Sequence, residues 1–245
     1  MNISSETNQA SNSLFRSPSF FNEFADRRSW EPGWLADFRK EKWEEAMCLL
    51  IENVLKTYKT NFKSINFLSC NNFIKIKNNL LMIEFIKTFS DFTNRKINYY
   101  IIGDGQEKNE MEFKLKKYKK FFNFKIIKQI KSLPDFLINN KIHFFMNFSS
   151  QEGMSFSIME ALSCGIPVIS SDISANKNLV NKSRGYIINL KNFKSSCGKV
   201  THQITNDIMQ KKRYLSKSNN AINFINKNLI NKICYNQFYK KIKRL

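Results

Sequence analysis

The sequence predicts an α/β protein with a doubly wound, mostly parallel sheet and helices on both faces. Short apolar runs alternate with helical patterns of about 10–15 residues along most of the chain, which is typical of βαβ units. Several runs are apolar at successive positions, as in strands buried on both faces. The 245 residues, 42% of them hydrophobic, are enough to build a sizeable core.

Three strands and two helices make up the first half of the predicted fold. Residues 65–70 form a short apolar run and are predicted to be a strand. Residues 78–92 carry large apolar side chains at helical spacing, which predicts a helix. Residues 97–105 are predicted to be a strand that ends in a glycine-bounded turn. A charged amphipathic helix over 107–121 and a strand over 122–127 follow.

The second half begins with a short helix over 133–140, which Pro134 would start. The run IHFFMNF over 142–148 predicts a buried strand. A helix over 155–165 closes at Gly165, because glycine is common just after a helix. The remaining predicted elements are a strand over 166–171, a short helix over 177–181, a strand over 185–190, and two or three helices up to Leu245.

The N-terminal region differs in composition from the rest of the chain. Residues 1–48 hold all three Trp and carry 8 acidic and 6 basic residues, whereas residues 49–245 carry 12 acidic and 34 basic. The first 20 or so residues are rich in Ser and Asn and are expected to be disordered. A helix is predicted from about Leu35 to Tyr58. The sequence therefore predicts an N-terminal extension over 1–62 and a domain over 63–245.

The net charge of +20 is not interpreted as a nucleic-acid signal. The lysines are spread along the chain and mixed with Asn and Ile, which is the pattern of a background compositional bias. Phe and Tyr fall at helical spacing and are expected in the core, not on a basic binding face. We therefore expect no nucleic-acid partner, although a basic nucleic-acid-binding module is kept as a less favoured alternative.

The five cysteines favour a reducing compartment. Their number is odd and they form no C-x-x-C motif, which argues against a disulfide framework or a zinc site. No uncharged apolar stretch approaches the length of a membrane-spanning helix, and the polar N-terminus lacks the features of a secretory signal. A cytoplasmic location is predicted.

The stretch over 149–172 carries the chemistry. It follows a buried strand, so it is expected at the carboxyl edge of the parallel sheet, where doubly wound folds bind ligands. Gly153 would allow a close backbone approach to a ligand, and Ser155 would open a helix whose first N–H groups suit a diphosphate. Glu160 could hold a ribose diol, and Glu152 sugar hydroxyls or a developing positive charge. A capped surface helix with two unrelated glutamates remains an alternative on spacing alone.

The segment EGMSFSIMEALSCGIPVI over 152–169 resembles the E-x7-E motif of family 4 glycosyltransferases. In that family the motif belongs to the Rossmann-like, C-terminal, donor-binding domain of the GT-B fold. FLSCNNFIKIKNNLLMIEFIKTF and INYYIIGDGQEKNEMEFKL resemble the family's first strand–loop–helix and its G-D-G turn, in the expected order. The resemblance covers about residues 63–245 and is closest to the branch found in bacterial surface-polysaccharide synthesis.

The resemblance implies a role for each matching residue. Glu152 falls on the first glutamate of the motif and is the implied catalytic residue, and Glu160 falls on the ribose-binding one. Lys77 stands where a lysine reaches the donor diphosphate, and Asn72 stands where many members have Arg, which weakens the expected charge clamp. The implied donor-binding residues are Asn72, Lys77, Gly153, Met154, Ser155, Phe156 and Glu160. The resemblance implies no metal and no cofactor, which fits the absence of an Asp-x-Asp pair.

The resemblance implies a hexosyltransferase-type enzyme that transfers a glycosyl unit from a nucleotide-sugar, with retention, to a polysaccharide or lipid-linked acceptor. A full GT-B enzyme has an N-terminal acceptor domain, and residues 1–62 do not resemble one. We therefore expect this domain to be missing here, so that the chain can be inactive alone or act with a separate acceptor-domain chain.

Two other interpretations remain open. One is a non-catalytic nucleotide-sugar-binding remnant or half of a split enzyme. The other is a membrane-surface module, since residues 228–245 are basic and amphipathic and could contact anionic lipid at the inner face of the membrane.

Overall fold

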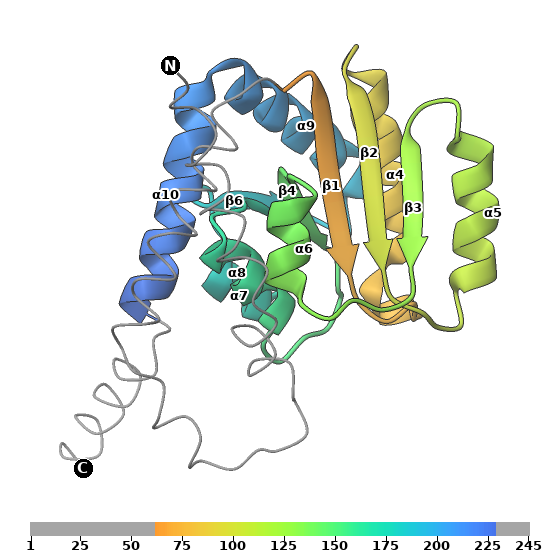
Figure 1. Ribbon diagram of the computed structural model, residues 1–245, viewed down its shortest axis with the longest axis horizontal. Helices are drawn as coiled ribbons and strands as arrows, with labels where there is room; N and C mark the ends of the chain where they lie inside the picture. The colour runs from red at the N-terminus through yellow and green to blue at the C-terminus, as the bar shows by residue number, and fades with distance from the viewer. Residues whose placement is uncertain (1–61, 229–245) are drawn as a thin grey trace, which may run out of the picture. The chain divides into compact units, whose positions relative to one another are not determined.

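The computed structural model describes residues 62–228, which form a six-stranded sheet flanked by helices (Figure 1). The strands are β1 (Ser64–Cys70), β2 (Lys96–Ile102), β3 (Asn123–Ile127), β4 (Phe144–Asn147), β5 (Val168–Ser171) and β6 (Gly185–Ile188). Their order in the sheet is β3-β2-β1-β4-β5-β6, and every neighbouring pair is parallel. The chain builds outward from β1 to β3, crosses back to β4, and builds outward on the other side. This is the predicted doubly wound fold.

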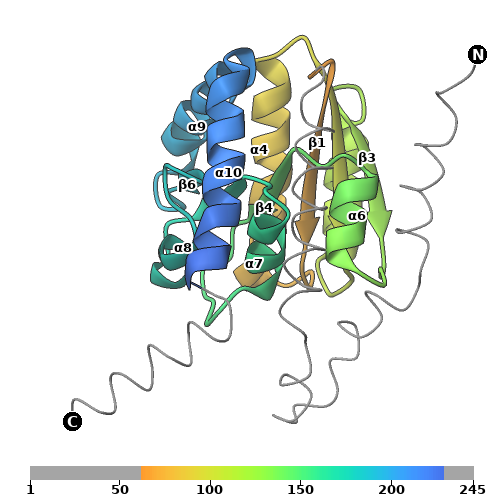
Figure 2. The same ribbon diagram turned by 60° about the vertical axis from the view of Figure 1, so that its left-hand side comes forward.

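Helices cover both faces of the sheet (Figures 1 and 2). They are α4 (Asn79–Asp91), α5 (Lys108–Tyr118), α6 (Leu133–Asn139), α7 (Phe156–Ser163), α8 (Ser174–Leu179), α9 (Phe193–Met209) and α10 (Lys211–Asn228). Helix α4 packs against α5 and α9, whereas α7 packs against α6 and α10. Phe67 of β1 contacts Phe89 of α4, while Tyr100, on the opposite face of β2, contacts Phe136 of α6. Helices α4 and α6 therefore cover opposite faces of the sheet.

The predicted strands and helices within the described residues are confirmed, with two differences. The short helix predicted over 177–181 begins earlier and ends at Leu179, because Val180 is extended and the Asn181 side chain accepts hydrogen bonds from Ser183 in a turn. A 3-10 turn, η2 (Lys75–Lys77), was not predicted. The predicted helix over 35–58 and the end of the C-terminal helices lie outside the described residues.

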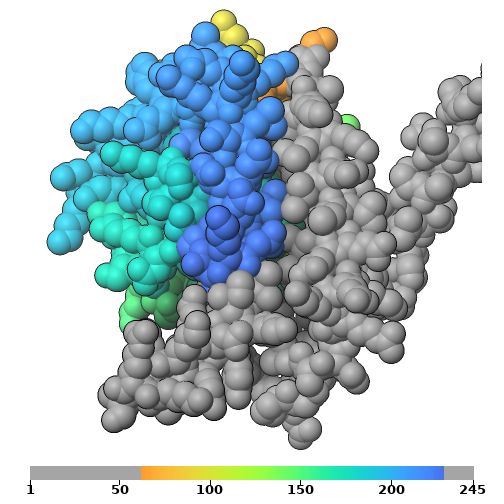
Figure 3. All heavy atoms as spheres, turned by 90° about the vertical axis from the view of Figure 1, so that its left-hand side faces the viewer, coloured from red at the N-terminus to blue at the C-terminus, as the bar shows by residue number. Residues whose placement is uncertain are grey.

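Phenylalanine side chains form the centre of the core. Phe67, Phe85, Phe144 and Phe148 are fully buried, and Phe67 stacks on Phe144 of the neighbouring central strand. Helix α10 runs along one face of this body beside α9 (Figure 3). Its Tyr214 hydroxyl donates to the His143 carbonyl oxygen at 2.9 Å, which ties α10 to the start of β4.

His143 is a packed residue. It is buried just before β4, and its Nδ1 accepts a hydrogen bond from the backbone N–H of Asn66 at 3.0 Å. Burial lowers the pKa of His143 to about 4, because the charged imidazolium would lose its hydration there. The side chain is therefore neutral at pH 7 and belongs to the amino edge of the sheet, away from the strand ends that position the candidate site.

Candidate functional site

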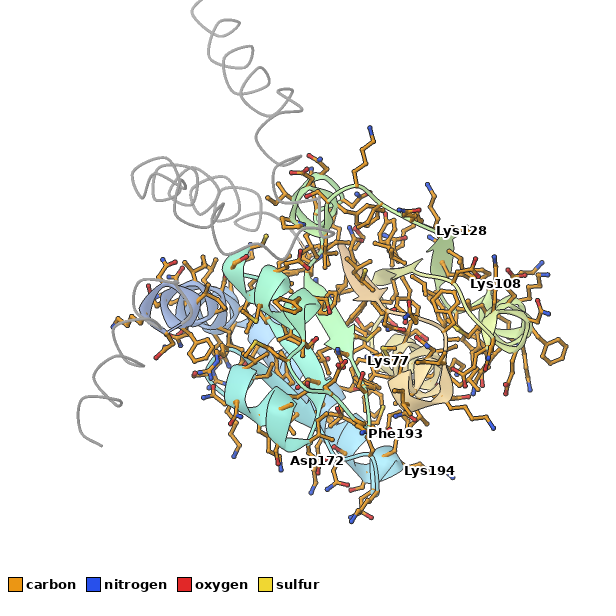
Figure 4. The ribbon with its side chains drawn as sticks, turned by 90° about the horizontal axis from the view of Figure 1, so that it is seen from below. Lys77, Lys108, Lys128, Asp172, Phe193 and Lys194 are labelled. Atoms are coloured by element: carbon orange, nitrogen blue, oxygen red, sulfur yellow. The ribbon has the colours of Figure 1, made fainter. Side chains whose placement is uncertain are left out.

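The predicted site residues lie at the carboxyl edge of the sheet, on the loops that follow β1 and β4. These two strands are neighbours, and the winding direction reverses between them, which is where doubly wound folds bind ligands. Figure 4 looks onto this edge and shows Lys77 near its middle, with Lys108 and Lys128 toward the β2–β3 side. Asp172, Phe193 and Lys194 lie on the β5–α9 side in the same view.

The loop after β1 is fixed against the glycine-bounded turn after β2. Phe73 is fully buried, and its N–H donates to the carbonyl oxygen of Asp104 at 2.9 Å. Gly103 has a φ of +142°, and a Cβ on it would lie 1.9 Å from the carbonyl oxygen of Asn71. The backbones approach so closely that a side chain cannot fit between them. The turn therefore supports the loop that presents Asn72 and Lys77.

Lys77 and Glu152 form an ion pair. The Lys77 Nζ lies 2.6 Å from the Glu152 Oε1, and the two side chains are only 18% and 13% exposed. The same oxygen accepts from the Ser149 hydroxyl at 2.9 Å. Partial burial alone would raise the pKa of Glu152, but the hydrogen bond and charge of Lys77, helped by neutral donors, hold it below its ordinary value. Glu152 is therefore an ionised carboxylate at pH 7.

The first turn of α7 lies beside this pair. Ser155 is the residue before the helix, and the first bond within the helix runs from the Met159 N–H to the Ser155 carbonyl oxygen. The earlier N–H groups of Phe156 and Ser157 therefore have no carbonyl partner inside the helix, and no side-chain oxygen of Ser155 caps them. Unpaired N–H groups and the positive end of the helix dipole favour an anion at this point.

The remaining predicted residues surround this centre. Gly153 has open space around its Cα, and the side chains of Met154 and Phe156 are 58% and 53% exposed. Glu160 is half-buried on α7, one to two turns beyond the helix start. Asn72 is exposed, and its carbonyl oxygen accepts from the Ile74 N–H at 3.0 Å. Direct contacts thus join Lys77 to Glu152, while the other predicted residues lie on the same two loops and α7.

A family model described as glycosyl transferases group 1 matches residues 51–221. The chain belongs to this family. The match covers both loops of the site and the whole of the described sheet. A comparison with curated proteins gave no match.

Solved glycosyltransferase structures share the fold of this group 1 protein. A TarM mutant from S. aureus, crystallised with UDP among other ligands, superposes with a TM-score of 0.60 at 18% identity, over 72% of this chain and 35% of TarM. Anabaena HepE with UDP-glucose gives 0.59 at 13% identity, over 79% of this chain and 53% of HepE. The C-terminal domain of LpcC from Francisella tularensis gives 0.55 at 18% identity, over 67% and 85%. The shared fold is that of a GT-B C-terminal domain.

The sequence did not single out the polar residues that hold the glutamate loop of this group 1 domain. Asn147, the last residue of β4, donates to the Ser155 hydroxyl at 3.1 Å. The Ser171 hydroxyl, at the end of β5, donates to the Ser149 carbonyl oxygen and accepts from Asn176. Two features of the sequence could have pointed to these residues. One is a polar residue inside the apolar run 142–148, and the other is a serine pair that ends the next strand.

A cavity elsewhere on the group 1 domain does not include the predicted residues. It measures about 400 Å³ and lies beside the edge strand β6, with walls from β6, α9 and α10. Among residues 62–228, no helix is long and apolar enough to cross a membrane, and no group of three His, Cys, Asp or Glu could hold a metal ion. The predicted residues gather instead at the open edge where β1 and β4 end.

Proposed function

We propose that this domain binds a nucleotide-sugar at its carboxyl edge and serves as the donor half of a retaining, family 4 glycosyltransferase. The observation that carries the proposal is the Lys77–Glu152 ion pair, placed beside the N-terminus of α7. One cation, one carboxylate and a row of backbone N–H groups match the diphosphate and the sugar of such a donor. UDP or UDP-glucose bound in the TarM and HepE structures supports a uridine diphosphate sugar, with a hexose as the transferred unit.

Lys77 and the start of α7 would stabilise the departing nucleoside diphosphate. An ammonium group at the end of a flexible side chain can turn from Glu152 toward phosphate oxygens and offers them three N–H donors. The N–H groups of Phe156 and Ser157 add partial positive charge on the other side. Charge that develops on the leaving group would therefore meet preorganised donors. We propose that these groups replace a metal ion, so that a chelator leaves transfer unchanged.

The two glutamates would bind different parts of the donor, Glu152 the sugar and Glu160 the ribose. Glu152 is ionised and held by several donors, so it can accept from sugar hydroxyls or face positive charge at the reacting carbon. Glu160, further along α7, would hold the ribose diol, with Asn72 and the loop from Gly153 to Phe156 completing the donor site. The proposed acceptor is a polysaccharide or lipid-linked glycan of a bacterial surface pathway.

Transfer would need an acceptor-binding part in addition to the described residues. The chain spans 35% of TarM and 53% of HepE, and the described sheet superposes on their GT-B architecture. We propose that this part comes from a separate chain. We also propose that a lipid-linked acceptor would place the enzyme at the inner face of the membrane. A non-catalytic nucleotide-sugar-binding remnant or half of a split enzyme is the second candidate, because donor binding alone would use the same residues.

Titration calorimetry with UDP and UDP-glucose tests donor binding directly. A site with one cation and an open edge should bind UDP with a Kd of about 0.1–1 mM. The chelator EDTA should not change this affinity. If neither compound binds at roughly ten times that concentration, the donor-site proposal is wrong.

Kinetics then separate the transferase from the remnant. With an acceptor-binding chain supplied, Glu160→Gln should raise KM for the donor with little change in kcat, because a ribose diol is held equally in ground and transition states. Glu152→Gln should lower kcat by about 10²-fold or more, on the order of 2.7 kcal/mol. Equal losses of donor affinity in both variants would make Glu152 a second binding residue only. If no acceptor-binding chain restores transfer, the remnant interpretation is favoured.

A further inference from the structure

Asn147 is the buried centre of the hydrogen bonds that hold the glutamate loop. It is the last residue of β4 and only 3% exposed. Its Nδ2 donates to the Ser155 hydroxyl at 3.1 Å and, at a longer 3.4 Å, to Glu152 Oε1. Its Oδ1 accepts from the Ser149 N–H at 3.1 Å. A single amide thus connects the strand end, the glutamate and the residue just before α7.

These contacts require an amide and not merely a polar side chain. The Nδ2 group faces two oxygens, one of them a carboxylate, while the Oδ1 faces an N–H. Aspartate has the same shape but only acceptor atoms when ionised, so it would place negative charge beside Glu152. Serine is shorter and could not reach all three partners of Asn147 together.

The hydrogen bonds are anchored from the neighbouring strand. Ser171 at the end of β5 donates to the Ser149 carbonyl oxygen, and Asn176 of α8 donates to the Ser171 hydroxyl at 2.9 Å. Ser149, Ser171 and Asn176 are all buried. The backbone around Asn147 is therefore fixed by buried groups, and the Asn147 amide is held in one orientation.

We propose that Asn147 is a positioning residue of the donor site, which keeps Glu152 aligned with the first turn of α7 when Lys77 moves toward the donor diphosphate. The role of Lys77 in this statement rests on the proposed function. Lys77 comes from the loop after β1, whereas Asn147 and Ser149 belong to the same segment as Glu152. The two neutral donors therefore stay with the carboxylate when the ammonium changes partner. Asn147 would act on sugar binding through Glu152, and not on the diphosphate.

The test compares Asn147→Asp with Asn66→Asp. Asn66 is also a buried amide at one end of a central strand, and its Nδ2 donates to the Asn140 carbonyl oxygen at 3.0 Å. It lies at the opposite, amino edge of the sheet. The control variant therefore also replaces a buried, hydrogen-bonded amide by a carboxylate, and it leaves the donor site untouched.

Two readouts decide the proposal. Carbon NMR of the ligand-free protein should give Glu152 a pKa at least about one unit higher in Asn147→Asp than in wild type, and unchanged in Asn66→Asp. Calorimetry should show UDP-glucose binding weakened about tenfold in Asn147→Asp and UDP binding weakened less than about threefold. Equal weakening of both ligands, or an unchanged Glu152 pKa, would overturn the proposal.

The readouts also distinguish this proposal from the proposed function. If wild type binds neither ligand, the donor site is wrong, while the Glu152 pKa still reports whether Asn147 controls that carboxylate. If Asn147→Asp fails to fold, Asn147→Ser serves in both measurements, because it removes the contacts without adding charge. In that variant the loss of UDP-glucose affinity must again exceed the loss of UDP affinity, or the positioning role is refuted.

Discussion

Removing the Lys77 ammonium is the most direct perturbation of the site. Lys77→Met keeps most of the length of the side chain and deletes the charge that lies 2.6 Å from Glu152 Oε1. If Lys77 also reaches the donor diphosphate, the variant loses one charge-assisted contact, worth about 1.5–3 kcal/mol. That loss corresponds to roughly a 10- to 150-fold increase in the Kd for UDP.

The same substitution should alter stability in a pH-dependent way. The pair is mostly but not fully buried. We therefore expect its loss to lower the unfolding free energy by about 1–2 kcal/mol at pH 7, which lies between the values for exposed and for buried ion pairs. Since the folded-state pKa of Glu152 lies below its ordinary value, this contribution is present above about pH 4.3 and is lost as pH falls through the folded pKa. The unfolding free energies of wild type and variant should therefore converge in acid.

Calorimetry with UDP measures the change in affinity. Urea unfolding at pH 7 and pH 3 measures the change in stability. Lys75→Met is the matched control, because Lys75 lies on the same 3-10 turn, is exposed, and carries the same charge. The control should bind UDP almost as wild type does. Unchanged UDP affinity in Lys77→Met, or an equal loss in Lys75→Met, would refute the assignment of Lys77 to the diphosphate.

Two further predictions concern the scaffold. Gly103→Ala should lower the unfolding free energy by at least about 3 kcal/mol, because its Cβ would lie 1.9 Å from the Asn71 carbonyl oxygen at a φ of +142°. Gly198→Ala, in α9 with open space around it, should instead raise the unfolding free energy by about 0.5–1 kcal/mol. Urea unfolding of the two variants measures both changes. Wild type should lose about 2 kcal/mol of stability between pH 7 and pH 5, because His143 binds its proton only when unfolded in this window, and His143→Gln should remove most of that loss.

The fold could be predicted because its signals are local. The buried runs over 65–70 and 142–148 are mostly apolar, and segments such as 78–92 carry helical spacing. The order of the strands, β3-β2-β1-β4-β5-β6, was not predicted, because it depends on which distant strands pair. The 3-10 turn over 75–77 could not be predicted, because packing of Phe73 on the turn after β2 shapes it, and that contact joins distant parts of the chain.

The site could be predicted only in part. The E-x7-E segment and Lys77 were assigned from the family resemblance, and the structure places both at the carboxyl edge of the sheet, while their roles stay predictions. Direct pairing of Lys77 with Glu152 could not be foreseen, since it depends on the register of β1 beside β4. Asn147 is likewise a single polar residue in an apolar run, and its role follows only from the geometry of its three partners.

The backbone of the site is fixed, whereas the charge of the Lys77 ammonium can move. The loop after β1 is held by the close packing on Gly103, and the loop after β4 is held by buried hydrogen bonds that reach β5. The Lys77 ammonium, at the end of a flexible side chain, can change partner while both loops stay in place. Without a donor, the ion pair neutralises two charges that would otherwise be costly at a partly buried edge. In the function that we propose, a donor diphosphate would bring negative charge to the ammonium, and the released carboxylate would keep its neutral donors. The ligand-free pairing therefore favours, and does not oppose, a catalytic role for Glu152.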